Sequence, residues 1–128
     1  MEHQDSILIV DDELALAETL CDVLVDSGYR VASAANGAEA LAYLRSHEAP
    51  SLILLDLMMP VMDGYTFRQE QLADPALAAI PVIVVTAGGP ASRIQGLRVA
   101  CTLQKPVSLP RLLAVLEAAL RPATISPA

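Results

Sequence analysis

Three features of the sequence predict an α/β fold built on a parallel sheet. Apolar runs rich in β-branched residues alternate five times with segments of helical periodicity, in units of roughly 20 to 25 residues. The run Leu-Ile-Leu-Leu at 52–55 is unbroken and lies between Pro50 and Pro60, which is typical of a strand buried on both faces. Right-handed crossovers leave few topologies for such a chain. The simplest is a flavodoxin-like (βα)5 fold, a doubly wound parallel sheet of strand order 2-1-3-4-5 in a three-layer αβα arrangement.

The individual elements follow the hydrophobic pattern along the chain. Strands are expected at 7–10, 29–34, 52–55, 80–85 and 99–103, and helices at 13–27, 38–46, 65–72, 91–97 and 109–120. Gly28 suits a left-handed cap after the first helix. Ser108 is a suitable N-cap for the last helix, whose first turn tolerates Pro110. Because Gly-Gly-Pro at 88–90 is a poor helix start, the fourth helix is expected to be short or irregular.

Composition and charge exclude several classes of function. The net charge is −7 and aromatic residues make up 3% of the chain, so neither a basic surface for nucleic acid nor a stacking platform for bases is expected. No apolar run is long enough to span a membrane, and the polar start at 1–5 is no signal peptide, so we expect a cytoplasmic protein without a membrane partner. Cys21 and Cys101 are far apart and are expected to be small buried apolar residues, not metal ligands or a disulfide.

The length of 128 residues suits one domain with a substantial core. We expect this domain at 5–121, followed by a loose tail at 122–128 that shows no periodicity. No linker, second composition or internal repeat indicates another domain.

Polar side chains stand where the expected strands end. Asp11 and Asp12 follow the first strand, Asp56 the third, Thr86 the fourth and Lys105 the fifth. Taken singly, each is more often a turn residue, a helix cap or a solvated surface group. In an open α/β sheet, however, ligands bind at the carboxyl ends of the strands, where the strand order reverses. The sequence therefore predicts three carboxylates, a hydroxyl and an ammonium group around one crevice.

Three carboxylates within a few ångströms repel one another, so either one keeps a proton or a hard cation neutralises them. Oxygen ligands of this kind suit Mg²⁺. Two rival chemistries fit less well. A phosphatase with Asp56 as nucleophile would need an acid–base group two positions later, where Met58 cannot transfer a proton. A flavodoxin-like cofactor site would need a phosphate loop where the acidic run 11–13 stands.

Five short motifs occur in an order that is highly specific when they are taken together. They are Ile-Leu-Ile-Val-Asp-Asp-Glu at 7–13, Leu-Asp-Leu-Met-Met-Pro at 55–60, Met-Asp-Gly at 62–64, Val-Thr-Ala at 85–87 and Lys-Pro at 105–106. The chain resembles the receiver domains of two-component response regulators, the CheY-like family, over about residues 5–121. The resemblance implies a signalling phosphoprotein of a phosphorelay, not an enzyme, although such a domain takes part in its own phosphoryl transfer and autodephosphorylation.

The resemblance also implies roles for the crevice residues. Asp56 would be the phosphoacceptor, whose carboxylate attacks a phosphohistidine of a histidine kinase or a phosphotransfer protein. Mg²⁺ would be ligated by Asp12, Asp56 and the backbone carbonyl of Met58, and Asp11 would reach the ion through water. Lys105 would neutralise the phosphoryl oxygens. No effector domain is expected after residue 121, so the domain would signal to a downstream protein target as a monomer or a weak homodimer, unless the sequence is a fragment of a longer chain.

The resemblance also implies a conformational switch that passes phosphorylation to the surface, and two threonines stand at its expected positions. By the same resemblance, Thr86 would donate a hydrogen bond to the phosphoryl group, and its movement would pull the following loop inward. Family members usually carry an aromatic residue or His where this chain has Thr102, as a rotamer switch coupled to the other threonine. The switch is therefore expected to be atypical, which leaves open a second interpretation, a docking module of the receiver fold that does not switch.

Overall fold

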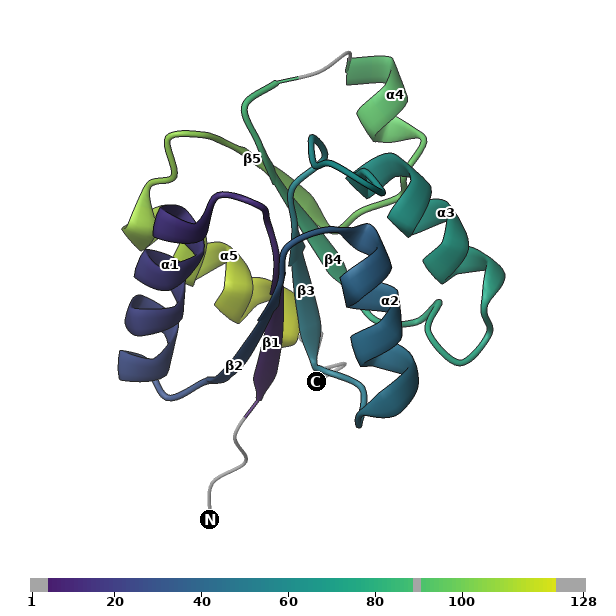
Figure 1. Ribbon diagram of the computed structural model, residues 1–128. Helices are drawn as coiled ribbons and strands as arrows, with labels where there is room; N and C mark the ends of the chain where they lie inside the picture. The colour runs from purple at the N-terminus through teal and green to yellow at the C-terminus, as the bar shows by residue number, and fades with distance from the viewer. Residues whose placement is uncertain (1–4, 89–90, 122–128) are drawn as a thin grey trace, which may run out of the picture.

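The computed structural model describes residues 5–88 and 91–121, in which strands and helices alternate. The elements are β1 (Ser6–Val10), α1 (Leu14–Asp26), β2 (Arg30–Ala34), α2 (Gly37–Ser46), β3 (Leu52–Leu55), α3 (Gly64–Ala73), β4 (Val82–Thr86), α4 (Ala91–Gln95), β5 (Cys101–Gln104) and α5 (Leu109–Leu120). The strands pair in parallel in the order β2-β1-β3-β4-β5, which confirms the predicted topology (Figure 1).

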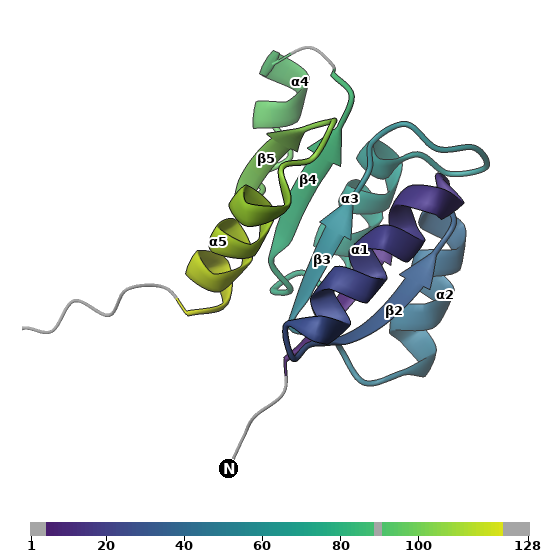
Figure 2. The same ribbon diagram turned by 90° about the vertical axis from the view of Figure 1, so that its left-hand side faces the viewer.

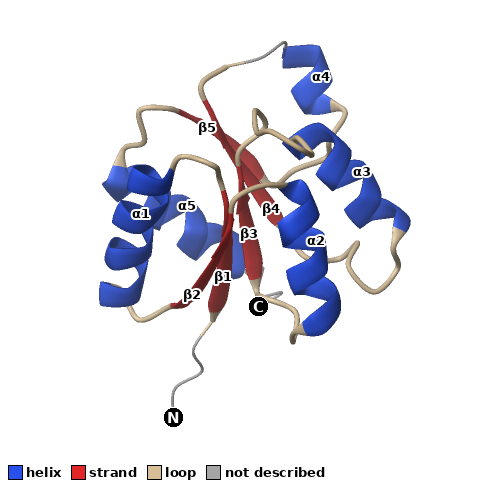
Figure 3. Ribbon diagram, viewed as in Figure 1, coloured by secondary structure: helices blue, strands red, loops and turns tan. Residues whose placement is uncertain are grey.

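Helices cover both faces of the sheet, as predicted. The helices α1 and α5 lie on one face and α2, α3 and α4 on the other (Figure 3). Successive side chains of a strand point to opposite faces, so each strand supplies both cores. On β1, Leu8 and Val10 join the core beside α2 and α3, whereas Ile7 and Ile9 join the core beside α1 and α5. Every residue of β3 and β4 is buried, as expected for strands covered on both faces.

The helix ends follow their local sequence. Asn36, Asp63 and Ser108 cap α2, α3 and α5, since each side chain accepts a hydrogen bond from the backbone N–H three residues later. Gly28 closes α1 with a φ of 99°, the left-handed conformation that its position predicted. The helix α4 has five residues, which confirms the expected shortening.

Two strands were predicted to begin two residues too early, and the other strand ends lie within one residue of the prediction. β4 begins at residue 82 and not at 80, because Pro81 has no N–H for the ladder and Ile80 closes the preceding turn. β5 begins at residue 101 and not at 99, because Arg98 has a left-handed φ of 57° that belongs to the turn before the strand.

Both thiols were also predicted wrongly as buried. Cys21 and Cys101 are free cysteines that are partly exposed.

Within residues 5–88 and 91–121, no helix combines the length and the apolar character that crossing a bilayer requires. The predictions for residues 89–90 and for the tail at 122–128 lie outside the described residues.

A buried polar network holds the end of the α4 segment against α3. Arg68 of α3 is 5% exposed, and its guanidinium donates hydrogen bonds to the carbonyl oxygens of Leu97 and Arg98 over 2.9 and 2.8 Å. It also donates to Gln71 Oε1 over 2.8 Å, and that amide donates to two carbonyls of the α3–β4 connection. Burial lowers the pKa of the Arg68 guanidinium, which among the described residues has no carboxylate partner. Backbone carbonyls thus take the place of a counter-ion.

Replacing Arg68 with Ala should destabilise the domain, because it removes three hydrogen bonds and leaves buried oxygens without a donor. We expect the free energy of unfolding to fall by about 2 to 4 kcal/mol, measured by urea denaturation followed by circular dichroism. Arg45→Ala is the matched control: this arginine is exposed, its contact with Asp74 spans 3.9 Å, and its loss should cost less than about 0.5 kcal/mol. Equal losses in both variants would contradict the importance of the network.

Candidate functional site

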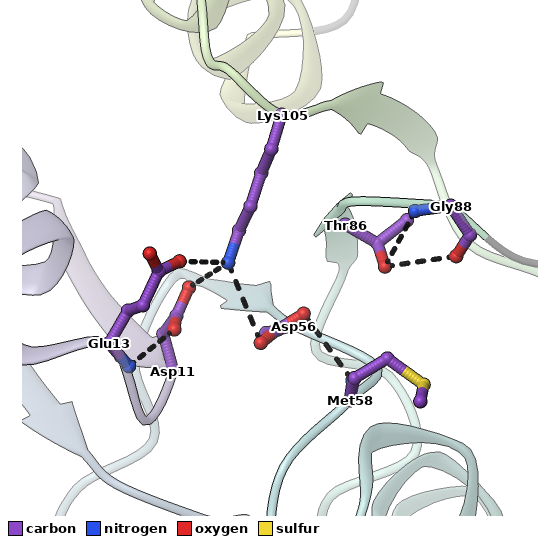
Figure 4. Close-up of polar contacts among 7 residues, drawn as sticks. All are labelled: Asp11, Glu13, Asp56, Met58, Thr86, Gly88 and Lys105. Carbon is purple, nitrogen blue, oxygen red and sulfur yellow. Dashed lines mark hydrogen bonds and ion pairs between the residues drawn. The ribbon is translucent and has the colours of Figure 1, made fainter.

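The predicted crevice lies at the carboxyl edge of the sheet. Asp11 follows β1, Asp56 follows β3, Thr86 ends β4 and Lys105 follows β5, so four strands each deliver one polar side chain. Backbone hydrogen bonds continue past the strand ends: Asp56 N donates to Val10 O and Lys105 N donates to Thr86 O, both over 2.9 Å. These bonds hold the polar residues at one level, and Figure 4 shows the Lys105 side chain extending toward the two aspartates.

Asp11, Asp12 and Asp56 form the expected acidic cluster. One carboxylate oxygen of each lies within 4.8 Å of the others. Asp11 and Asp56 are 4% and 5% exposed, whereas Asp12 is open to solvent. The cluster therefore offers hard oxygen donors and one open side for water, which is the donor set that Mg²⁺ prefers.

Lys105 neutralises part of this cluster. Its Nζ lies 3.1 Å from Asp11 Oδ2 and 3.6 Å from Asp56 Oδ2. Its shortest contact, 2.7 Å, is to Glu13 Oε1 (Figure 4), and the Glu13 N–H donates to Asp11 Oδ1 over 2.8 Å. Sequence analysis had not assigned Glu13 to the site, and the one available signal was its place directly after the two aspartates. Lys105 is thus held closer to the exit of β1 than to Asp56.

Burial and charge shift two pKa values in the crevice. Burial raises the pKa of Asp56, the negative charge of Asp11 raises it further, and the charge of Lys105 opposes this rise. Burial alone would lower the pKa of Lys105, but hydrogen bonds to Glu13 and Asp11 and the charges of Asp11 and Asp56 together raise it. The Lys105 ammonium therefore remains charged at neutral pH, and the Asp56 carboxyl group holds its proton to a higher pH than an exposed aspartate does.

A close backbone contact fixes the turn that carries Asp56. After β3 the chain passes the start of α3, where Gly64 N donates to Leu57 O over 3.0 Å. A Cβ atom at Gly64 would lie against the carbonyl oxygen of Asp56 and 2.8 Å from Leu57 Cα. Only glycine fits there. The Met-Asp-Gly motif thus supplies the helix cap Asp63 and the glycine that lets α3 begin beside the phosphoacceptor candidate.

Met58 adjoins the acidic cluster. Its N–H lies 3.4 Å from Asp56 Oδ1, and its side chain is 67% exposed. It lines a cavity of about 760 Å³ that Asp12, Asp56 and Lys105 also line. The cavity connects the carboxylate of Asp56 with the surface, so a reacting group can reach it from outside.

The two threonines assigned to the switch lie on neighbouring strands. Thr86 is 1% exposed, and its hydroxyl donates to Gly88 O over 3.2 Å and accepts from Gly88 N over 3.5 Å (Figure 4). Thr102 pairs with Val84 in the β4–β5 ladder, is partly exposed, and lines two surface cavities of about 340 and 400 Å³. Thr102 therefore lies beside open cavities. The Thr86 hydroxyl is hydrogen-bonded to Gly88, which follows β4.

Comparison of the chain with models of known protein families finds a match over nearly the whole domain. The model described as the response regulator receiver domain matches residues 7–117. The chain belongs to this family. Receiver domains are signalling domains of two-component systems, so the motif-based expectation is confirmed at this level.

Curated relatives of this receiver domain are longer proteins. Response regulator Rre1 of Synechocystis is 40% identical over 121 residues, which cover 91% of this chain and 52% of Rre1. Response regulator PleD of Caulobacter vibrioides is 41% identical over 104 residues, which cover 79% of this chain and 23% of PleD. The chain thus spans about half of the first relative and less of the second.

Solved structures confirm the CheY-like flavodoxin fold. The phosphorylated cyanobacterial phytochrome response regulator RcpA superposes with a TM-score of 0.81 at 30% identity, covering 98% of this chain and 100% of RcpA. Chemotaxis protein CheY4 of Vibrio cholerae superposes with a TM-score of 0.83 at 28% identity, covering 91% of this chain and 99% of CheY4.

The raised pKa of Asp56 predicts the pH dependence of stability. A carboxyl group with a raised pKa binds its proton more tightly in the folded state, so it lowers the free energy of unfolding as pH rises from its usual value of 3.8 through the raised value. Asp56→Asn removes this contribution. The difference in stability, Asp56→Asn minus wild type, should therefore grow with pH over that interval and stay constant above it.

Urea denaturation of both proteins at a series of pH values measures this difference. Asp63→Asn is the control for the exchange of a carboxylate for an amide outside the crevice, because asparagine caps a helix as well as aspartate does. A stability difference for Asp56→Asn that is flat or shrinks with rising pH would contradict the electrostatic account of the crevice.

Proposed function

We propose that this receiver domain accepts a phosphoryl group on Asp56 from a phosphohistidine of a histidine kinase or a phosphotransfer protein. The observation that carries the proposal is the distance of 3.6 Å between Lys105 Nζ and Asp56 Oδ2, two side chains that line the same open cavity. In the reaction a carboxylate oxygen of Asp56 attacks phosphorus, the P–N bond breaks, and the imidazole nitrogen keeps the electron pair. Such transfer depends mainly on positioning and charge neutralisation, for which the ammonium is well placed.

The ion pair between Glu13 and Lys105 is weak enough for the Lys105 ammonium to exchange partners. Glu13 is exposed, so water screens its ion pair with Lys105 and the pair is weak. A phosphoryl group on Asp56 adds negative charge inside the crevice, where the dielectric constant is lower. Lys105 would then leave Glu13 and bind a phosphoryl oxygen. The same side chain thus supports the free and the phosphorylated state.

We also propose that the domain binds Mg²⁺, because a cation would reduce the repulsion among the carboxylates of Asp11, Asp12 and Asp56. The ion would be held by Asp12, Asp56 and the backbone carbonyl of Met58, with Asp11 reaching it through water. When bound, it would neutralise the phosphoryl oxygens and lower the raised pKa of Asp56, which keeps the nucleophile ionised. The fit rests on the carboxylate oxygens within 4.8 Å of one another and on the exposed side of Asp12.

Thr86 provides a route from the crevice to α4. A hydroxyl has one proton to donate, and in this structure Thr86 donates it to Gly88 O. A hydrogen bond to a phosphoryl oxygen would therefore release the Gly88 carbonyl and free the loop before α4. This competition would couple phosphorylation to the surface around α4 even with Thr102 in place of an aromatic residue, and the signal would pass to a downstream protein in the cytoplasm.

The second candidate function is a docking module of the same fold that does not switch. The hollow beside Thr102 favours it, because no large side chain there follows a movement of Thr86. The oligomeric state that suits either function is a monomer or a weak homodimer.

Asp56→Asn should abolish the uptake of phosphate from acetyl phosphate and Mg²⁺, because an amide forms no acyl phosphate. Intact-protein mass spectrometry should find one added phosphoryl group on the wild-type protein and none on the variant, and chelation of the metal should prevent the labelling. Asp63→Asn is the matched control and should label like the wild type. Labelling of Asp56→Asn at the wild-type rate would overturn the assignment of the phosphoacceptor.

Beryllium fluoride, a stable mimic of the aspartyl phosphate, separates the two candidate functions. With Mg²⁺, a switching domain should show amide NMR shifts at Asp56, Thr86 and Lys105 that extend through 91–104, because Gly88 is released. A docking module should show shifts at the crevice alone. Thr86→Val should confine the shifts to the crevice in either case, and shifts that still reach α4 in that variant would refute the hydroxyl competition.

A further inference from the structure

The connection between β3 and α3 carries two of the proposed Mg²⁺ ligands, the side chain of Asp56 and the backbone carbonyl of Met58. Within residues 5–88 and 91–121, one backbone hydrogen bond ties residues 58–62 of this connection to another element. Gly37 N, in the first turn of α2, donates to Met62 O over 2.9 Å. Figure 2 shows the start of α2 and the connection at the same end of the sheet. The helix α2 thus supports the segment that holds Met58.

This connection contains a strained turn. Val61 has a φ of 67°, in the left-handed region that β-branched residues avoid. Met62 N donates to Pro60 O over 2.7 Å, so residues 60–62 form a γ-turn around Val61. The Val61 side chain is 85% exposed, so its burial offsets little of the strain. A turn of this kind persists only where surrounding contacts hold it, and the bond from Gly37 reaches the last residue of the turn.

Gly37 permits this bond because it has no side chain. A Cβ atom at Gly37 would lie 2.8 Å from Met62 Cγ, 2.9 Å from Met62 Sδ and 3.0 Å from Met62 O, so any larger residue would push Met62 away. The start of α2 is itself well fixed. Asn36 Oδ1 accepts a hydrogen bond from Glu39 N, and Glu39 Oε1 accepts one from Ala35 N, both over 2.9 Å, which resembles a capping box. Met62 therefore rests against a rigid helix end.

We propose that Gly37 is a positioning residue for Mg²⁺, because its bond to Met62 keeps the Met58 carbonyl beside the acidic cluster. Mg²⁺ requires near-ideal octahedral geometry, so a ligand carbonyl that is displaced by part of an ångström binds it less well. Contacts that orient a ligand from outside typically change metal affinity by about 10- to 100-fold. The inference rests on the proposed Mg²⁺ site, and it adds a residue of α2, a helix that delivers none of the crevice side chains.

Gly37→Ala in the full 128-residue chain should weaken Mg²⁺ binding by about tenfold, measured as the dissociation constant in an amide NMR titration with Mg²⁺ alone. Arg68→Ala is the control for lost stability away from the crevice, and its dissociation constant should stay within about twofold of the wild type. Wild-type affinity in Gly37→Ala, or an equal loss in both variants, would overturn the proposal. Absence of Mg²⁺ binding by the wild type would instead overturn the proposed metal site.

Hydrogen exchange in the wild-type protein tests the same coupling without a substitution. Coupling between two equilibria is reciprocal, so Mg²⁺ must favour the Gly37 bond by the factor by which the bond favours Mg²⁺. Saturation with Mg²⁺ should therefore slow exchange of the Gly37 N–H by about tenfold. The Leu112 N–H, which donates to Ser108 O in the first turn of α5, reports any general gain of stability and should slow less. Equal slowing of both N–H groups would refute the role of Gly37, even if Gly37→Ala fails to fold.

Discussion

The repulsion between Asp11 and Asp56, buried side by side at the ends of β1 and β3, is the constraint on which the rest of the site depends. Parallel strands bring their carboxyl ends to one edge, so the topology that buries the core also forces these carboxylates together. Lys105 relieves part of the repulsion, and the open side at Asp12 leaves room for a cation. Positive charge therefore stabilises the crevice, and phosphoryl transfer also depends on positive charge beside the reacting group.

The fold and the main site residues could be predicted because their signals are local. Strands buried on both faces appear as unbroken apolar runs, and the residue after each run must lie at the edge of the sheet. The contact of Glu13 with Lys105 and the network around Arg68 could not be predicted, because both depend on where long side chains reach across elements distant in sequence. On a helical pattern Arg68 looks like a surface residue, and only the tertiary fold shows that it is buried.

The two ends of the α4 segment are held by bonds of different strength. At its far end, the buried Arg68 guanidinium donates to the carbonyls of Leu97 and Arg98, and such charge-assisted bonds inside a protein are strong. Near its start, one neutral hydroxyl bonds to Gly88 over 3.2 Å, and a bond of that kind contributes about 1 kcal/mol. Any movement of α4 should therefore begin at the Gly88 end.

A phosphoryl group can shift α4 only by as much as it binds one arrangement better than the other. In the proposed switch, the Thr86 hydroxyl would supply that difference without a large side chain at position 102, because its one proton would go either to Gly88 O, as in this structure, or to the phosphoryl oxygen.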